Sequence, residues 1–472
     1  MNRRSIKIRA AVVTGAAMLL GTVGVVSGPA SAQNVQLPTL DSPVRIRNRV
    51  GEDAIRALGS RLDGVADRLS LRGDQLAEVV RRDRTLSVDA SSELVVHDEA
   101  ADHALSAASA ADWPTTPVFP DIKTFSLHSK SSNVKRTIYL DFNGHTMTGT
   151  TWNTAENRNS ITLAPFDLDG KPSTFTRSEL AVIQNVYLSV REDFGVFDVD
   201  VTTADPGTAA LAKSSAGDDT YGIRIVVTPT DFQDCDCGGA AYPGSFGSST
   251  GTPGYVLQGT AKTIAEAVSH EAGHTLGLSH DGVTTKDAAC AADSKKCSYY
   301  RGHGDWAPIM GVGYYERITQ WSKGEYANAN NTQDDIAIIK KLIPYVVDWG
   351  GTMATARNYP LGTKVYADPI NWAGDVDAYS FTVSATRSVT VKVDNWYGDT
   401  VDTNLNARIR LLNSSGSVIA TASPTATTSA ALTLSLAKGK YYVYVDGVGD
   451  GIPSTTGYST YGSIGRYNVS FV

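Results

Sequence analysis

The feature that most limits what this chain can fold into is the segment 270–281, which reads HEAGHTLGLSHD. Residues four apart on a helix share a face, so His270 and His274 can direct their imidazoles at one point. Gly277 follows, and glycine readily adopts the left-handed conformation in which many helices end. The chain can then turn and bring His280 back to the same point. The segment therefore predicts a helix, a glycine stop and three converging histidines.

Three imidazoles with one open position form a zinc site of the catalytic kind. Glu271 projects about 100° around the helix from His270, given about 3.6 residues per turn, so it can reach a metal-bound water rather than the metal. Such a carboxylate takes the proton of the water and passes it to the leaving amine. We predict that one catalytic zinc ion is held by His270, His274 and His280, and that Glu271 acts as the general base. The alternative, a helix with two surface histidines, leaves Gly277 and the third histidine unexplained.

The pattern HExxHxxGxxH over 270–280 resembles the zinc signature of the metzincin proteases. The aspartate that follows, Asp281, is similar to that of the adamalysin (reprolysin) branch. The resemblance covers about residues 133–345. It implies an α/β (α+β) catalytic domain with a twisted mixed sheet and a long active-site helix. It also implies zinc-dependent hydrolysis of peptide bonds.

Metzincins have a methionine turn beneath the metal, and residues 307–311 (APIMG) resemble such a turn. The resemblance implies that Met310 packs under the histidines as a hydrophobic floor; an ordinary core methionine is the alternative. It also implies that Asp281 holds the turn after His280 from outside the metal site. A plain surface aspartate is the alternative there.

Some metzincins carry a tyrosine two residues after the methionine, where this chain has Val312. Tyr314 and Tyr315 stand further along and are offset candidates for stabilising an oxyanion. The glycine-rich segment 238–246 precedes the predicted zinc helix. By the same resemblance, this is where metzincins place the strand that binds extended substrate.

Periodicity predicts the other elements of this region. Helical spacing of apolar residues extends over 177–193 and 263–276. Alternation predicts strands at 137–142, 199–203, 223–228 and 254–258. A strand followed by a helix and further strands is the order expected of an α/β lobe with a twisted sheet. We therefore place the catalytic domain at residues 131–348.

The N-terminus has the features of an export signal, which we place at residues 1–32. Positive charges precede an apolar stretch over 10–26, and Ala30-Ser31-Ala32 fits a signal-peptidase site. Glycines interrupt the apolar stretch, which argues against a permanent membrane anchor. We predict a secreted, extracellular protein. General secretion and the twin-arginine route, suggested by Arg3-Arg4, are alternative routes of export.

Residues 33–130 are predicted to be a propeptide and linker. Apolar residues recur at helical spacing between 51 and 84, which predicts one or two amphipathic helices. The segment contains no cysteine, so it cannot cap a zinc ion with a thiolate. If it keeps a zymogen silent, it does so with a carboxylate, a histidine or steric cover. A stalk or a folding aid is the alternative.

All four cysteines lie between residues 235 and 297, around the zinc motif. An even number of cysteines in an exported chain indicates disulfide bonds, and four cysteines allow three pairings. We favour a local loop closed by Cys290 and Cys297, which leaves a tight ring between Cys235 and Cys237. The crossed pairings stay open, as does metal binding by the Cys-x-Cys pair.

Short alternating runs, separated by turn residues, fill the C-terminal segment 349–472 and predict an all-β sandwich. The strings at 374–381 (GDVDAYSF) and 439–445 (GKYYVYV) resemble bacterial pre-peptidase C-terminal modules. Such modules often accompany secreted proteases, and some of them bind calcium or matrix substrates. Metal-free turn aspartates are the alternative to calcium ligands. The candidate Ca²⁺ ligands are Asp375, Asp377 and Asp399.

The formal net charge of −7, without a basic stripe, argues against nucleic acid as a partner. We predict a secreted zymogen that hydrolyses peptide bonds of extracellular proteins, and we expect a monomer. The alternative is an extracellular protein that binds matrix or cell wall and carries a vestigial zinc domain. The intact Glu271 argues against this alternative, because a zinc site without catalysis needs no general base.

Overall fold

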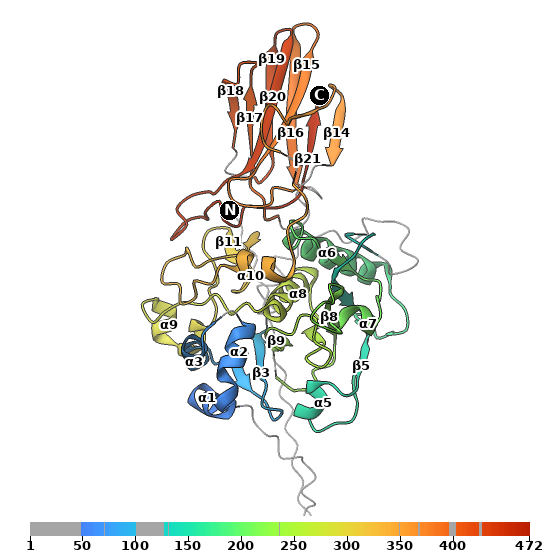
Figure 1. Ribbon diagram of the computed structural model, residues 1–472, viewed down its shortest axis with the longest axis vertical. Coiled ribbons are helices and arrows are strands. Elements are labelled where there is room, and N and C mark those ends of the chain that lie inside the picture. Colours follow the sequence, from blue (N-terminus) through green and yellow to red (C-terminus); the bar gives the residue numbers. More distant parts are fainter. Residues whose placement is uncertain are drawn as a thin grey trace, which may run out of the picture. The chain divides into compact units, whose positions relative to one another are not determined.

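The computed structural model describes residues 49–69, 71–100, 127–130, 132–235, 237–348, 350–366, 369–395, 403–423 and 427–472. The predicted signal peptide lies outside the described residues, as does most of the predicted linker. The described residues all belong to one unit of the chain (Figure 1). Within these ranges, no helix is long and apolar enough to cross a membrane.

An eight-stranded mixed sheet is the centre of the catalytic region, with the order β1-β2-β3-β9-β10-β8-β4-β7. Four of its strands run parallel to their neighbours: β7 (Asp200–Thr202), β4 (Arg136–Asp141), β8 (Tyr221–Thr228) and β10 (Gly254–Leu257). The next strand, β9 (Cys237–Ala241), is antiparallel to β10. This arrangement confirms the mixed sheet expected from the sequence, and the four parallel strands lie close to the predicted positions.

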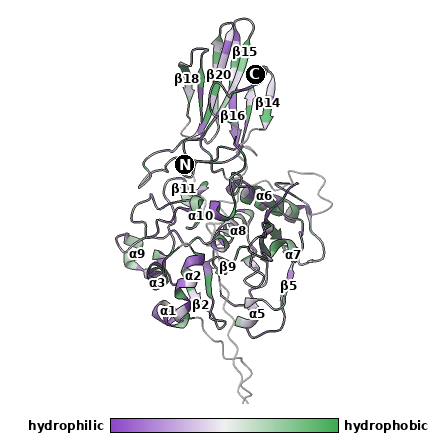
Figure 2. Cartoon of the chain, in the orientation of Figure 1, coloured by the Kyte–Doolittle hydropathy of each residue, from purple (hydrophilic) through white to green (hydrophobic). Residues whose placement is uncertain are grey.

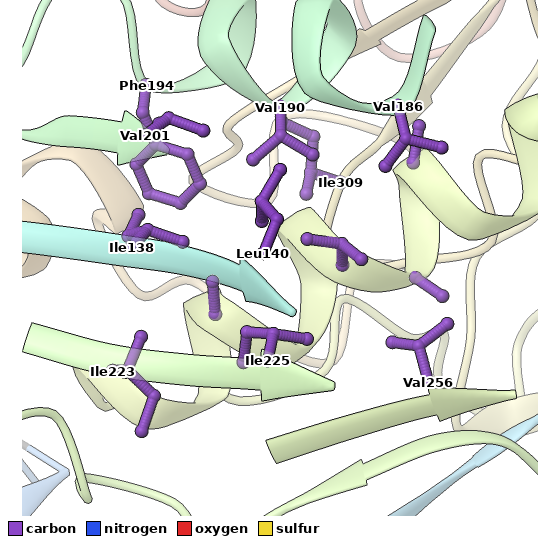
Figure 3. Packing of buried hydrophobic residues seen from close by; sticks show 14 of the residues in the cluster. Ile138, Leu140, Val186, Val190, Phe194, Val201, Ile223, Ile225, Val256 and Ile309 are labelled. Carbon is purple, nitrogen blue, oxygen red and sulfur yellow. The ribbon is translucent and has the colours of Figure 1, made fainter. Parts of the chain in front are cut away.

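Two long helices cover the sheet. They are α6 (Arg177–Asp193), which begins at the predicted residue, and α8 (Ala261–Leu276). The Thr176 side chain caps α6 by accepting a hydrogen bond from the Glu179 N–H, as in a capping box. Figure 3 shows apolar side chains of α6 pointing towards Ile138 and Leu140 of β4. Each such side chain contributes about 1.5–3 kcal/mol when it is fully buried, so this core fixes α8 against the sheet.

The predicted propeptide, called the pro-segment below, folds into an α-helical part and a strand part. Its helices are α1 (Gly51–Leu58), α2 (Leu62–Arg68) and α3 (Gly73–Arg82), where the sequence predicted one or two. The helical run is divided because Gly59 has a φ of 52°, a conformation that no α-helix continues through. Its strands are β1 (Arg49–Val50), β2 (Leu86–Val88) and β3 (Leu94–Glu99).

These pro-segment strands extend the catalytic sheet, because β3 pairs antiparallel with β9 (Figure 1). The pro-segment also has an apolar core of its own, made mainly of side chains from its helices and from β2 and β3. It is therefore a folded element that shares a sheet with the catalytic region. The sequence analysis did not predict these three strands.

Shorter elements complete the catalytic region. A hairpin and two short helices lie on one side, and a two-stranded parallel ribbon follows the disulfide loop. These elements are β5 (His145–Met147), α5 (Thr151–Ala155), β6 (Ile161–Leu163), α7 (Thr208–Leu211), α9 (Ala288–Ala292), β11 (Trp306–Pro308), β12 (Ile318–Gln320) and α10 (Asp335–Leu342).

The C-terminal region is a β-sandwich, as the sequence predicts. One sheet has the order β13-β15-β20-β17-β18 and the other the order β14-β21-β16-β19, and they enclose one apolar core. Inward and outward residues alternate along β16, and Figure 2 shows mixed hydropathy along these strands. The strands are β13 (Arg357–Asn358), β14 (Thr363–Tyr366), β15 (Val376–Val383), β16 (Arg387–Asn395), β17 (Ala407–Leu412), β18 (Val418–Ala422), β19 (Ala430–Leu436), β20 (Gly439–Gly447) and β21 (Tyr467–Phe471).

Candidate metal centre

Helix α8 carries the first two histidines and ends where the sequence predicts. It begins at Thr260, whose side chain accepts a hydrogen bond from the Thr263 N–H. It ends at Gly277, which has the left-handed values φ 104° and ψ 14°. A side chain at Gly277 would also approach the carbonyl oxygen of Arg68 to 3.0 Å. The glycine thus ends the helix and allows the pro-segment backbone to pass close by.

The three histidines converge, and each has its Nδ1 atom engaged. His270 Nδ1 donates to the carbonyl oxygen of Ile309 at 2.7 Å, and His274 Nδ1 donates to that of Leu278 at 2.9 Å. His280 Nδ1 donates to the carboxylate of Asp83 at 2.6 Å. Because each Nδ1 carries a proton, each Nε2 faces the common centre and can bind a metal ion through its lone pair when it is not itself protonated. This is the tautomer and orientation that a metal ion requires.

Protonation of the histidines differs with their surroundings. Burial lowers the pKa of His270 to about 3, so its imidazole is neutral and able to bind a metal. Burial also acts to lower the pKa of His280, but Asp83 and Asp98 outweigh it and raise the value to about 10. A metal ion at the centre therefore competes with a proton for His280 Nε2.

The fourth side chain at the centre is Asp98, from β3 of the pro-segment. Its Oδ1 lies 2.7 Å from His280 Nε2, and its Oδ2 lies 3.4 Å from His270 Nε2 and 3.5 Å from His274 Nε2. The Nε2 atoms of His274 and His280 are 2.9 Å apart. Ligand atoms of a tetrahedral zinc ion are about 3.3–3.5 Å apart, given bonds of about 2.0–2.2 Å. The separations of 3.4 and 3.5 Å lie in this range, whereas the two that involve His280 Nε2 are shorter.

Two buried atoms at the centre support the same interpretation. His270 Nε2 and Asp98 Oδ2 lie within the protein without a hydrogen-bond partner among the described residues. Buried polar atoms without partners are costly, and a cation between them would satisfy both. The donor set of imidazole nitrogens and a carboxylate oxygen also suits zinc. The residues present therefore fit the ion that the sequence predicts.

Glu271 is fully buried beside the centre and faces β9. A Cβ atom at Gly239 of β9 would overlap the Glu271 carboxylate, so the glycine makes the space that this carboxylate occupies. Burial raises the pKa of Glu271 well above its ordinary value, and the neighbouring Asp98 carboxylate raises it further. The structure thus places the predicted base next to the predicted metal ligands.

Met310 and Asp281 are joined by a backbone hydrogen bond beside the helix that carries His270 and His274. A Cβ atom at Gly273 would lie 2.5 Å from Met310 Sδ, so the thioether packs directly against the zinc helix. The Met310 carbonyl oxygen accepts a hydrogen bond from the Asp281 N–H at 2.7 Å. Asp281 is 1% exposed, so it is not a surface aspartate, and burial raises its pKa to about 7. Together they tie the methionine turn to the chain that follows His280.

The tyrosine closest to the centre is one that the sequence analysis did not single out. Tyr299 donates from its hydroxyl to Asp98 Oδ1 at 2.8 Å, and its ring centroid lies 4.4 Å from that of His280. Tyr314 is also buried, and its hydroxyl lies 3.4 Å from the carbonyl oxygen of Glu99. The third tyrosine considered, Tyr315, is only partly buried.

Comparison with known families agrees with these observations. Residues 183–322 match the model of the reprolysin-like metallo-peptidase family M12, and residues 375–447 match that of the bacterial pre-peptidase C-terminal domain. This chain carries an M12 metallopeptidase domain. The matched segment includes α8 with His270 and His274, and also His280 after the helix, and its family implies zinc as the metal.

Among solved structures, the C-terminal module is similar to the pre-peptidase C-terminal domain of a collagenase from Bacillus anthracis, with 20% identity and a TM-score of 0.19. That match covers 27% of this chain and 100% of the other. A periplasmic inhibitor of g-type lysozyme from Aeromonas hydrophila has 15% identity and a TM-score of 0.17, with 25% and 97% of the two chains covered. No curated protein matches the chain.

The disulfide bonds of the M12 domain are those favoured from the sequence. Cys290 pairs with Cys297, and Cys235 pairs with Cys237, so the crossed pairings are not formed. The cysteines therefore take no part in the metal centre.

The structure does not gather the candidate calcium ligands of the C-terminal module. Asp375 Oδ2 accepts from the Asn371 N–H at 2.7 Å, and Asp377 Oδ2 accepts from the Tyr467 hydroxyl at 2.5 Å. Asp399 lies outside the described residues. Over the described ranges, neither Asp375 nor Asp377 belongs to a cluster with the spacing of a metal site.

Proposed function

We propose that this chain is an exported zinc endopeptidase of the metzincin type that cleaves extracellular proteins. The observation that carries the proposal is the convergence of three imidazole Nε2 atoms beside a buried glutamate, within an M12 domain. The match to a bacterial pre-peptidase C-terminal domain supports export, since such domains are typical of secreted proteases. The predicted signal at residues 1–32 supports it independently.

In the proposed reaction, His270, His274 and His280 hold the zinc ion through Nε2. The ion would supply Lewis-acid polarisation of a water molecule and of the scissile carbonyl. Glu271 accepts a proton from the water on its carboxylate and donates a proton to the amine nitrogen as the peptide bond breaks. Met310 packs under α8 and keeps the histidines in register.

The substrate strand is proposed to bind along β9. In the full chain this edge pairs with β3 of the pro-segment. Removal of the pro-segment would expose the backbone N–H and C=O groups of β9, to which an extended peptide can add as a strand. The edge lies next to Glu271, because Gly239 of β9 contacts its carboxylate. We therefore infer that the substrates are extended segments of protein chains.

The test is casein or gelatin hydrolysis by the processed extracellular protein, with and without a chelator. Replacement of the proposed base, Glu271→Ala, is expected to lower the rate by roughly 10²–10⁴. Glu325→Gln, which changes an exposed glutamate, is the matched control and is expected to retain full activity. Metal analysis of both variants should show one zinc per chain. Equal rates for Glu271→Ala and the parent would refute the mechanism.

The same assay separates the rival function, a matrix- or cell-wall-binding protein with a vestigial zinc domain. That function predicts bound zinc and adhesion without chelator-sensitive hydrolysis. Sequencing the N-terminus of the extracellular protein tests export and processing together. A mature start after residue 32 is expected if the pro-segment is retained, and a start near 130 if it is removed.

A further inference from the structure

We propose that the pro-segment keeps this protease latent by placing the carboxylate of Asp98 on the metal, in the position that the catalytic water needs. The inference rests on the proposed function, because it assigns a regulator to the same zinc site. Of the three ways in which the pro-segment could inhibit the protease, namely a carboxylate, a histidine or steric cover, it selects the carboxylate. Residues 33–130 contain two described histidines, and neither reaches the metal centre: His97 Nε2 contacts Gln233 Oε1 at 3.1 Å and His128 Nδ1 contacts Asp200 Oδ2 at 2.7 Å.

Strand pairing brings Asp98 to the centre. In the β3–β9 ladder, Val96 is opposite Ala241, His97 is opposite Ala240 and Asp98 is opposite Gly239. The register then shifts, so that Glu99 is opposite Cys237. Such an irregularity redirects the side chains next to it. Gly239 is also the residue against which Glu271 packs, so the ladder sets Asp98 beside the proposed general base.

The Asp98 carboxylate is held by hydrogen bonds at one oxygen and faces the metal centre with the other. Oδ1 accepts from the Tyr299 hydroxyl at 2.8 Å and lies 2.7 Å from His280 Nε2. Oδ2 faces His270 and His274 at 3.4 and 3.5 Å. A water molecule on the metal would need the space that this carboxylate fills. Asp98 would therefore be the fourth donor beside the three histidines and would occupy the position left for water.

Charge supports the same assignment. Asp98 is 4% exposed and Glu271 is fully buried, so two carboxylates lie close together away from solvent. Buried charges are strongly unfavourable unless they are paired or bind a metal. A divalent cation between the histidines and Asp98 supplies the compensating charge. Adjacent Glu99, in contrast, is exposed and pairs with Arg301.

The remainder of the pro-segment holds Asp98 in place. Asp83 accepts the His280 Nδ1 hydrogen bond, and Gln333 Nε2 donates to the Leu69 carbonyl oxygen at 3.3 Å. The apolar core of the pro-segment is independent of these contacts. Asp98 is thus one residue on a folded element. Removal of that element frees both the metal position and the edge of β9.

The test uses the full chain with Glu271→Ala, which prevents self-cleavage, and with Co²⁺ in place of zinc. The visible spectrum of Co²⁺ reports its ligands without any need for activity. Adding Asp98→Ala is expected to shift this spectrum and to speed metal loss to a chelator by roughly tenfold or more. Glu99→Gln, one residue along the strand, is the matched control and should change neither. Circular dichroism verifies that each variant is folded.

An unchanged Co²⁺ spectrum and chelation rate in Asp98→Ala would overturn the proposal and leave steric cover as the cause of latency. If Asp98→Ala does not fold, Asp98→Asn, which keeps the side-chain size and removes the charge, decides in the same way. The proposed function is tested separately by the chelator-sensitive activity of processed wild-type protein. That activity can be present even if Asp98 does not bind the metal. Failure of the Asp98 proposal and failure of the proposed function are therefore distinguishable.

Discussion

Gly239 shows how much a single residue decides at this site. A Cβ atom there would overlap the Glu271 carboxylate and lie 2.9 Å from the Tyr255 carbonyl oxygen. Neither neighbour can retreat easily, since one belongs to the backbone of β10 and the other is fully buried. The need for glycine at 239 thus comes from the reacting group itself and not from a turn.

We predict that Gly239→Ala displaces Glu271 and lowers the turnover of processed protein by about 10², as expected for a misplacement of about 1 Å. Zinc content should be unchanged, because the histidines are not displaced. Gly217→Ala is the matched control, since a Cβ atom there would meet nothing within 4 Å. Casein hydrolysis and metal analysis of both variants check the prediction. Normal turnover in Gly239→Ala would show that the Glu271 carboxylate can accommodate the added methyl group without losing its function.

Site residues that lie close together in the sequence could be predicted, whereas those that the fold brings together from distant segments could not. His270, His274 and Gly277 follow from helical spacing and one backbone conformation. Asp98 and Tyr299 reach the centre from segments about 170 residues before and 20 residues after the zinc motif, through pairing that no local pattern encodes. The absence of cysteine in the pro-segment excluded a thiolate, but it left a carboxylate, a histidine and steric cover open and indicated no particular residue.

Among the elements, the strongly periodic ones were predicted well. Helix α6 was predicted over its full length, and the alternating runs of the C-terminal segment predicted the strands of a sandwich. Strands β1 and β2 were missed because two or three residues carry no measurable alternation, and the six-residue β3 was missed as well. Strand β3 pairs with β9, and β2 and β1 add to it in turn, so these strands depend on the fold rather than on the local sequence.

The last turn of α6 contains a buried acid, Glu192, that makes the stability of the folded state depend on pH. Burial raises the pKa of Glu192 from its ordinary 4.5 to about 8, although Arg466 and Arg191 partly oppose the shift. The folded state therefore keeps a proton that the unfolded state loses between these two pH values. The stability that this group contributes is fully present below pH 4.5 and is lost as the pH rises to about 8.

We predict that Glu192→Gln makes the free energy of unfolding less dependent on pH within this window. For this one group the wild-type slope is at most about 1.4 kcal/mol per pH unit. Urea unfolding of the full chain at pH 5, 6, 7 and 8 measures the difference, with Glu325→Gln as control. Parallel curves for Glu192→Gln and wild type would mean that Glu192 is ionised in the folded protein.

In the molecule as a whole, the C-terminal module makes direct contacts with the catalytic region. Asn404 donates to Asp193 at 3.0 Å, and Asp193 in turn accepts from the Ser269 hydroxyl at 2.5 Å, one residue before His270. Arg466 donates to the Gly195 carbonyl oxygen at 2.9 Å. Ile464 belongs to the apolar core of the catalytic region and is 2% exposed. No local pattern indicates this sharing, because each region has a complete pattern of its own.

This shared core predicts that a module residue stabilises the catalytic region. Ile464→Ala is expected to cost about 2–5 kcal/mol, the usual effect of truncating a buried isoleucine. Ile452→Ala, in the same module segment but 60% exposed, is the matched control and should cost under about 0.5 kcal/mol. Chemical unfolding monitored by tryptophan fluorescence suits the measurement, because Trp321 lies in the same core. If both variants unfold like wild type, the packing of Ile464 does not contribute to the stability of the catalytic region. Loss of stability in Ile464→Ala alone means that proteolytic removal of the module also destabilises the protease.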